Sequence, residues 1–277
     1  MTVVAQISDT HLSADKPFFS DNFRATCAAI AARGADLIVN TGDVTLNGAD
    51  EAADLVAARQ LHDAAGLPFR VVPGNHDIGD TAAVAATAPY HAQLVEPARL
   101  ARFRRHFGPG HWRHDLAGWR LIGINSQILG SGLPQEAEQE SFLAEAMAGA
   151  GDRAVALFWH KPLCDRDPGE TVTGGRFLHP AARHRLLELL GQRPPAVIAT
   201  GHVHQFRDLM VGASRHVWAP STGYVIPERA QPLYGIRDVG WVEHRFGADG
   251  SHHCSYLRAG EAATLSIADF PQAYGAM

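Results

Sequence analysis

Side chains that can bind metal ions stand at five places along this chain, each directly after a short apolar run. They are Asp9 and His11, then Asp43, then Asn75 (followed by His76 and Asp77), then His160, and finally His202 with His204. Taken singly, each is typical of a turn or a helix cap. Together, and with His76 set aside, they make two aspartates, one asparagine and four histidines. That set is too large for one tetrahedral ion, so it predicts two ions that share a bridging carboxylate.

The type of ligand also predicts the type of metal. Imidazole groups favour zinc, iron, manganese or a similar transition metal, whereas Mg²⁺ and Ca²⁺ prefer oxygen ligands. Two divalent ions carry about +4 of charge against about −2 from the two carboxylates, so the centre stays positive. Paired ions can hold both the attacking and the leaving oxygen of a phosphate ester. The sequence therefore predicts two transition-metal ions per chain that act on a phosphate ester.

The apolar runs that precede these residues are expected to be buried strands. They cover residues 3–7, 35–39, 69–72, 154–159 and 196–199, and helical patterns over 21–33 and 49–65 separate the first three. A β-α-β-α-β order predicts an α/β fold with a parallel or mixed sheet and helices on its faces. Because ligands bind at the carboxyl ends of strands in such sheets, all five segments should meet at one edge.

The rest of the chain continues the pattern and then changes character. Helices are expected over 89–107, 135–149 and 180–192, and a strand over 119–124. Short alternating runs at 206–211, 215–219, 239–246 and 252–258 predict mostly antiparallel strands. Because no linker-like composition interrupts the chain, we expect one catalytic domain over residues 1–259. Residues 260–277 are expected to form a weakly ordered tail.

Local spacing suggests how the side chains converge. Asp9 and His11 are two residues apart, and so are His202 and His204. In extended backbone, residues i and i+2 point to the same side, so each pair should reach into one cleft. The neighbouring Gly42, Gly74 and Gly201 should allow the backbone to turn sharply beside them.

These motifs, in this order, resemble the calcineurin-like metallophosphoesterase superfamily over roughly residues 3–210. The similarity is greatest to its bacterial phosphodiesterases of the cyclic-nucleotide and glycerophosphodiester type. The resemblance implies a four-layer α/β/β/α sandwich, in which two mixed β-sheets are flanked by helices. It also implies a binuclear metal site at the carboxyl-terminal ends of the strands.

The resemblance further implies a role for each matching residue. The ligands of the first metal would be Asp9, His11, Asp43 and His204. The ligands of the second would be Asp43, Asn75, His160 and His202, with Asp43 bridging. A hydroxide between the metals would attack phosphorus in line. His76 would be catalytic, as a general acid or a charge stabiliser at the leaving oxygen, and Asp77 would orient His76.

One departure bears on the substrate. The superfamily's Ser/Thr protein phosphatases carry a phosphate-clamping arginine after the Gly-Asp motif, whereas residues 42–48 here read GDVTLNG. Because a monoester dianion gains most from bidentate arginine, the absence of that arginine favours diesters. The resemblance makes cyclic nucleotides and glycerophosphodiesters the natural candidates. The alternatives are a phosphomonoesterase or pyrophosphohydrolase acting on nucleotide or lipid intermediates, and a non-catalytic metal-binding scaffold.

Composition narrows the partners. The 277 residues are 46% hydrophobic and 19% charged, with a net charge of −5 and three cysteines without CxxC spacing. An acidic balance without a basic stripe argues against nucleic acid. No apolar stretch is long enough for a membrane span, and the first residues do not form a leader, so we expect a cytoplasmic location and no membrane partner. A small-molecule phosphate ester is the expected partner, and a homo-oligomer stays open.

Two loops are candidates for the rim of the site. Residues 161–178 form a long polar insertion after His160, and residues 218–224 follow a predicted strand. Long loops often shape substrate choice, although they can equally be plain connections. Arg166, Arg176 and Arg207 could reach a phosphate, but surface ion pairing is the more ordinary use of such arginines.

Overall fold

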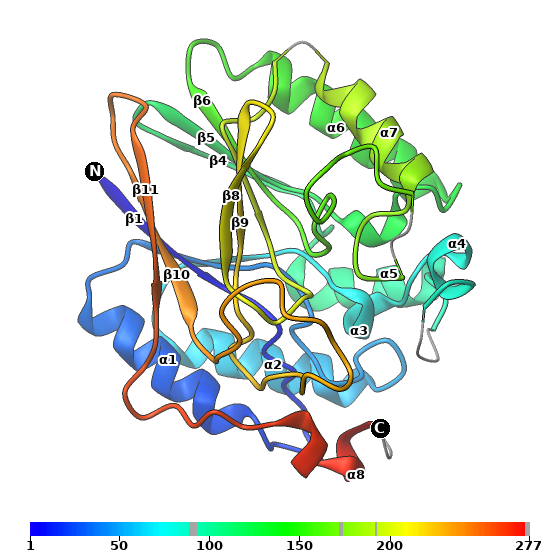
Figure 1. Cartoon of the computed structure of the whole chain (residues 1–277), viewed down its shortest axis with the longest axis vertical. Helices are drawn as coiled ribbons and strands as arrows, with labels where there is room; N and C mark the ends of the chain where they lie inside the picture. Colours follow the sequence, from blue (N-terminus) through cyan, green and yellow to red (C-terminus); the bar gives the residue numbers. More distant parts are fainter. Residues whose placement is uncertain (89–92, 172–173, 192, 275–277) are drawn as a thin grey trace.

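Two β-sheets pack face to face and helices cover their outer faces, as Figure 1 shows. This computed structural model describes residues 1–88, 93–171, 174–191 and 193–274. The predicted four-layer α/β/β/α architecture with two mixed sheets is confirmed.

The first sheet has the strand order β11-β10-β1-β2-β3. Its strands are β1 (Thr2–Ile7), β2 (Leu37–Asn40), β3 (Phe69–Val71), β10 (Trp241–Phe246) and β11 (His252–Leu257). β1, β2 and β3 run parallel, while β10 is antiparallel to both of its neighbours. Phe23 and Ile30 of α1 (Ser20–Ala32) and Leu55 of α2 (Ala52–Ala64) belong to the apolar cluster on its outer face.

The second sheet has the order β4-β5-β6-β7-β9-β8. Its strands are β4 (Trp112–Leu116), β5 (Trp119–Gly123), β6 (Ala154–Phe158), β7 (Val197–Thr200), β8 (Arg207–Val211) and β9 (Ser214–Trp218). The four inner strands are parallel, and β4 and β8 are antiparallel edges. α6 (Pro134–Ala148) and α7 (Pro180–Leu190) cover its outer face, and each has proline at its first position.

A third apolar layer lies between the two sheets. Val4 and Val39 of the first sheet meet Leu121, Phe158 and Val217 of the second in one buried cluster. Inner strands are therefore covered on both faces, and for that reason they read as continuous apolar runs rather than alternating ones. The continuous apolar runs from which these strands were predicted are therefore a consequence of burial on both faces.

Smaller elements complete the chain. They are α3 (Asn75–Ile78), α4 (Ala82–Ala85), α5 (Pro97–Phe107), η1 (Ser126–Ile128), η2 (Ile267–Asp269) and α8 (Pro271–Tyr274). The helix expected over 89–107 begins only at Pro97, since proline at the first helical position fits where a helix starts; residues 89–92 lie outside the described part. β4 was not predicted, because this edge strand carries exposed Arg113 and Asp115.

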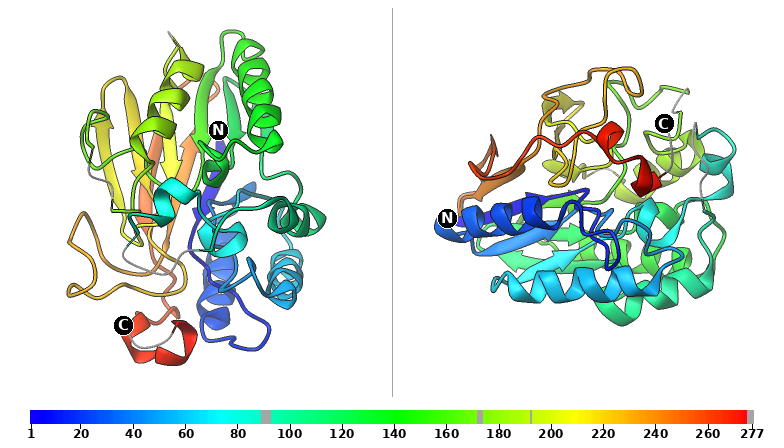
Figure 2. Two further views of the ribbon diagram at one scale, coloured as in Figure 1. Left: turned by 90° about the vertical axis from the view of Figure 1, so that its right-hand side faces the viewer. Right: turned by 90° about the horizontal axis from the view of Figure 1, so that it is seen from below.

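The C-terminal segment also differs from the expectation. Residues 260–274 pack against the molecule instead of forming a weakly ordered tail, and Ile267 and Ala273 are 3% and 8% exposed. They join Phe19 and Tyr224 in a small apolar cluster, which anchors the segment. Figure 2 shows it crossing the lower face of the molecule. Within the described residues, we find no helix with the length and apolar character needed to cross a membrane.

Candidate metal centre

All seven predicted metal ligands meet at one edge of the sandwich, in the loops that follow β1, β2, β3, β6 and β7. Backbone hydrogen bonds tie these loops together. The Asp9 amide donates to the Gly42 carbonyl at 2.9 Å, and the His11 amide donates to the Asp43 carbonyl at 3.0 Å. The Gly201 amide donates to the His160 carbonyl at 2.8 Å, and the His202 amide donates to Asp9 Oδ2 at 2.9 Å, which joins a loop of the second sheet to a loop of the first.

One cluster contains ligands predicted for the first metal. His204 Nε2 lies 3.3 Å from Asp9 Oδ1 and 3.3 Å from His11 Nε2. Ligand atoms on a tetrahedral ion with bonds near 2.0–2.1 Å are about 3.3 Å apart. The spacing of this cluster therefore matches one ion.

A second cluster contains the ligands predicted for the other metal. His160 Nε2 lies 3.1 Å from Asp43 Oδ2, 3.3 Å from Asn75 Oδ1 and 3.1 Å from His202 Nδ1. His11 Nε2 or Nδ1, Asp43 and His76 also lie within reach of one another, so Asp43 stands between the two clusters. This position suits a carboxylate shared by two ions.

In three of the predicted histidine ligands, the ring nitrogen that faces away from the centre has a hydrogen-bond partner. That partner determines which ring nitrogen carries the hydrogen and which one can bind a metal ion. The Nδ1 groups of His160 and His204 lie 2.8 and 3.0 Å from the carbonyls of Thr41 and Tyr224. His202 Nε2 lies 3.1 Å from the Gly175 carbonyl. Because a carbonyl only accepts, each of these nitrogens carries a hydrogen, and in the neutral ring the opposite nitrogen turns a lone pair towards the centre. Such outer partners are typical of metal-binding histidines.

Asp9 and His204 place two hydrogen-bond acceptors beside each other, an arrangement that suits a bound cation better than a direct contact between the two groups. Asp9 Oδ1 is buried and has no hydrogen-bond donor in the described part of the chain. His204 Nε2, 3.3 Å away, also offers a lone pair, because its Nδ1 donates to the Tyr224 carbonyl. A buried carboxylate oxygen without a donor is costly. A metal ion at this position satisfies both groups.

The backbone at five of the predicted ligands is strained. Among the described residues, the non-glycine positions with positive φ are Asp9, His11, Asp43, His202 and His204, at 45° to 66°. The pairs Asp9 with His11 and His202 with His204 converge as expected. The expectation of extended backbone was wrong, however, since all four residues have left-handed backbone. Each such conformation costs about 1–3 kcal/mol and persists where surrounding structure enforces it. All five positions are predicted ligands, so the strain is concentrated at this centre.

Electrostatics keep His11, His202 and Asp43, three of the predicted ligands, in the forms that bind a metal ion. Burial lowers the pKa of His11 and of His202 well below the usual range, so both rings are neutral. Burial alone would raise the pKa of Asp43, but the His160 and His76 rings lower it strongly. Burial also opposes a charge on His160, yet the Asp43 carboxylate raises the pKa of this ring to about 9. An ion that binds His160 must therefore displace a proton.

Gly74 allows a close approach rather than a sharp turn. Its φ is −106°, which any residue adopts, but a Cβ there would overlap the Asp43 carboxylate and amide. Gly42 does use a positive φ of 101°. The expected role of Gly74 is therefore corrected: it gives Asp43 room.

We expect Gly74→Ala to weaken Mn²⁺ binding by at least about tenfold and to cost about 1–3 kcal/mol of stability, because the new methyl displaces Asp43. Mn²⁺ titration and thermal unfolding measure both effects. Gly260→Ala is the matched control, since no atom lies within 4 Å of the added Cβ. Unchanged Mn²⁺ affinity in Gly74→Ala would contradict this reading.

His76 lies beside the two clusters, and Asp77 does not orient it through its side chain. His76 Nδ1 donates to the Leu46 carbonyl at 3.1 Å, and its Nε2 lies 4.0 Å from Asp43 Oδ2. Asp77 instead accepts from the Gly74 amide at 2.8 Å and from the Thr45 amide and hydroxyl at 2.9 and 2.6 Å. Asp77 thus joins the loop of His76 to the loop of Asp43.

Burial and the Asp43 charge raise the pKa of Asp77 to about 6. Four hydrogen bonds from the Gly74, Val44 and Thr45 groups favour its ionised form. Asp77 is therefore a carboxylate above that pKa, and it accepts from both loops at once. The correction to its expected role has a physical reason: backbone donors, and not the His76 ring, surround it.

Both candidate rim loops reach the ligands through backbone carbonyls. Gly175 of the 161–178 loop accepts from His202, and Tyr224 of the 218–224 loop accepts from His204. The Tyr224 ring also packs 4.8 Å from the His11 ring, between centroids. No sequence motif indicated Tyr224, because its contacts with His204 and His11 depend on how the 218–224 loop folds back onto the metal centre. Arg207 pairs with Asp165 and lies over Trp218, as ordinary ion pairing predicts.

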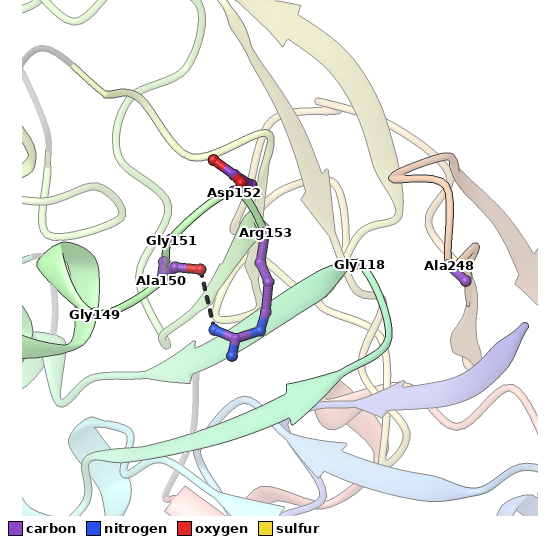
Figure 3. Close-up of a pocket in the computed structure, with 7 residues that line it drawn as sticks. All are labelled: Gly118, Gly149, Ala150, Gly151, Asp152, Arg153 and Ala248. Carbon is purple, nitrogen blue, oxygen red and sulfur yellow. Dashed lines mark hydrogen bonds between the residues drawn. The ribbon is translucent and has the colours of Figure 1, made fainter.

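A hollow lies away from these residues. About 500 Å³ opens between Gly118, the 149–153 segment and Ala248, where Arg153 donates to the Ala150 carbonyl (Figure 3). These residues precede the first residues of β5 and β6, so the hollow is at the amino ends of the strands. None of its lining residues is a predicted ligand.

Comparisons with known proteins find phosphoesterases similar to this chain. A family model described as calcineurin-like phosphoesterase matches residues 2–206. A glycerophosphodiester phosphodiesterase, GpdQ, from Enterobacter lignolyticus is 26% identical over 260 residues, which cover 88% of this chain and 86% of the relative.

Solved structures show the same fold at low identity. The GAP50 anchor of the Plasmodium inner membrane complex is 14% identical with a TM-score of 0.64, covering 95% of this chain and 86% of that one. A dimetal phosphatase from Danio rerio is 11% identical with a TM-score of 0.58, covering 88% and 92%. Because both an anchor and a phosphatase share the fold, any activity must be argued from the site.

Proposed function

The chain belongs to the calcineurin-like phosphoesterase family, and on that premise we propose that it hydrolyses small-molecule phosphodiesters with two transition-metal ions. The observation that carries the proposal is the convergence of inward lone pairs in two clusters separated by Asp43. A non-catalytic scaffold would have no need to retain this full set on strained backbone.

We assign the ligands as the resemblance implies. Asp9, His11, Asp43 and His204 would hold one ion, and Asp43, Asn75, His160 and His202 would hold the other. The imidazole-rich set supports manganese, iron or zinc. When bound, the two ions supply positive charge to the phosphate and lower the pKa of a water molecule.

The chain's own residues supply proton transfer and alignment. The Leu46 carbonyl holds His76 Nδ1, so Nε2 faces the centre with its side chain 27% exposed. We propose that Nε2 gives a proton to the leaving oxygen or stabilises its charge. Asp77 is then a positioning residue, because it fixes the turn that carries His76.

Two observations support a diester. The relative from Enterobacter lignolyticus is named for glycerophosphodiesters. In addition, the 42–48 loop has no arginine where protein phosphatases place one. A diester carries one negative charge at its phosphate, so it depends less on bidentate arginine than a monoester dianion does.

With Mn²⁺ present, we expect faster turnover of diesters than of a monoester. The panel contains an aryl diester, an aryl monoester of the same phenol, cyclic AMP and a glycerophosphodiester, each compared by kcat/KM. Using the same phenol in both aryl esters removes leaving-group differences. A higher kcat/KM for the monoester would overturn the diester assignment. No turnover of any ester by Mn²⁺-loaded protein would overturn the enzyme assignment.

A further inference from the structure

The C-terminal segment returns to the metal centre after β11. Asn22 of α1 holds it on both sides: Asn22 Nδ2 donates to the Ala263 carbonyl at 2.8 Å, and Asn22 Oδ1 accepts from the Ala263 amide at 2.9 Å. The Val225 amide donates to the Leu265 carbonyl at 2.8 Å. Figure 1 draws this segment in red, running past α1 into α8. Its end is therefore placed by specific contacts with the site's own loops.

Apolar contacts hold the last turn in place. The Phe270 ring packs 5.3 Å from Phe18 and 5.4 Å from Phe19, between centroids. Phe19 also packs 4.7 Å from Tyr224, the residue whose carbonyl accepts from His204. The segment and the metal centre thus share one packed cluster.

The side chain at the end of α8 contacts one of the predicted ligands, His11. The Tyr274 hydroxyl lies 2.7 Å from His11 Nδ1, on the side of the ring opposite Nε2, the nitrogen that faces His204. If Tyr274 donated here, His11 Nε2 would carry the hydrogen and point it at the cluster. For His11 to be a ligand, its Nδ1 must donate and the Tyr274 oxygen must accept.

We propose that Tyr274 is a positioning residue for the metal centre: its hydroxyl fixes the tautomer and orientation of His11. Backbone carbonyls do this for His160, His202 and His204. For His11, the corresponding partner is the side chain of Tyr274, 263 residues away in the sequence. The inference rests on the proposed metal assignment, and it makes the C-terminal segment part of the first metal site.

The ring of Tyr274 has a separate contact. Its centroid lies 5.0 Å from that of His76, and the Tyr224 hydroxyl donates to the Tyr274 hydroxyl at 3.4 Å. Tyr274→Phe keeps the ring and removes the hydroxyl, so it isolates the contact with His11. Tyr256→Phe is the matched control, because the Tyr256 hydroxyl bonds Asp238 and the Val239 carbonyl instead.

The test is a calorimetric Mn²⁺ titration of metal-free protein, with the full chain and both variants. In Tyr274→Phe we expect one of the two binding sites to weaken by about 10–100-fold while the other is unchanged. Thermal unfolding in a chelator should match the wild type. At saturating Mn²⁺, kcat should return to near the wild-type value, which a merely structural defect would not allow.

The outcomes separate this inference from the proposed function. Equal Mn²⁺ affinities in Tyr274→Phe and wild type would overturn the role of Tyr274 and leave the metal assignment standing. Equal weakening of both sites, or the same loss in Tyr256→Phe, would also overturn it, since the effect would then be general. A wild-type chain that binds no Mn²⁺ would overturn the metal assignment and this inference together.

Discussion

Asp43→Asn is expected to abolish tight binding of both metal ions and to slow diester hydrolysis by more than about 10³-fold, a loss of several kcal/mol. Asp43 stands between the two clusters, with Oδ2 3.1 Å from His160 Nε2. Asparagine tolerates the left-handed backbone here, at a φ of 49°, and it can still accept from the His76 amide. The substitution therefore removes the shared charge while the fold is kept.

Metal content after dialysis, and Mn²⁺ titration, measure the effect. Asp9→Asn is the matched control, because Asp9 also has a left-handed backbone but belongs to one cluster only. We expect Asp9→Asn to lose one ion and Asp43→Asn to lose two. If Asp43→Asn keeps one ion as tightly as Asp9→Asn does, Asp43 is not shared between the sites.

The layers of the fold could be predicted because burial leaves a direct trace in the sequence. β2 and β6 are covered on both faces, so β6 is apolar throughout and β2 is apolar up to its last residue, Asn40, and predicted ligands follow where each strand ends. β4 leaves a weaker trace, since it is an edge strand with alternate residues exposed. The local composition of a segment therefore indicates a strand that is fully buried, and it gives little indication of a strand that is only partly buried.

The convergence of the predicted ligands at one edge could be expected from the sequence for a related reason, while their local backbone geometry could not. Asp9 and His202 stand just past strand ends, and this position can be read from order along the chain. Their left-handed backbone cannot, because the loops that enforce it come from different parts of the sequence. Tyr274 is the extreme case: it contacts His11 only because Phe270 and Ile267 dock the last segment, and no local pattern encodes that docking.

His76→Ala is expected to keep both ions and to slow turnover by about 10²–10⁴-fold if the ring acts as a general acid. The imidazole is placed for this by its bond to the Leu46 carbonyl, which leaves Nε2 facing the cluster 4.0 Å from Asp43. Metal analysis and kcat on a diester provide the measurements. His184→Ala serves as control, since that side chain is 79% exposed on α7.

The dependence on the leaving group decides between the two roles proposed for His76. An alkoxide is a strong base and needs a proton as the bond to phosphorus breaks, whereas a nitrophenolate leaves without one. A general acid therefore predicts a much larger loss for a glycerophosphodiester than for a nitrophenyl diester in His76→Ala. A residue that only stabilises charge predicts more similar losses for the two esters. Near-normal turnover of the alkyl diester would exclude His76 from the chemistry and leave the two ions as the main source of leaving-group stabilisation.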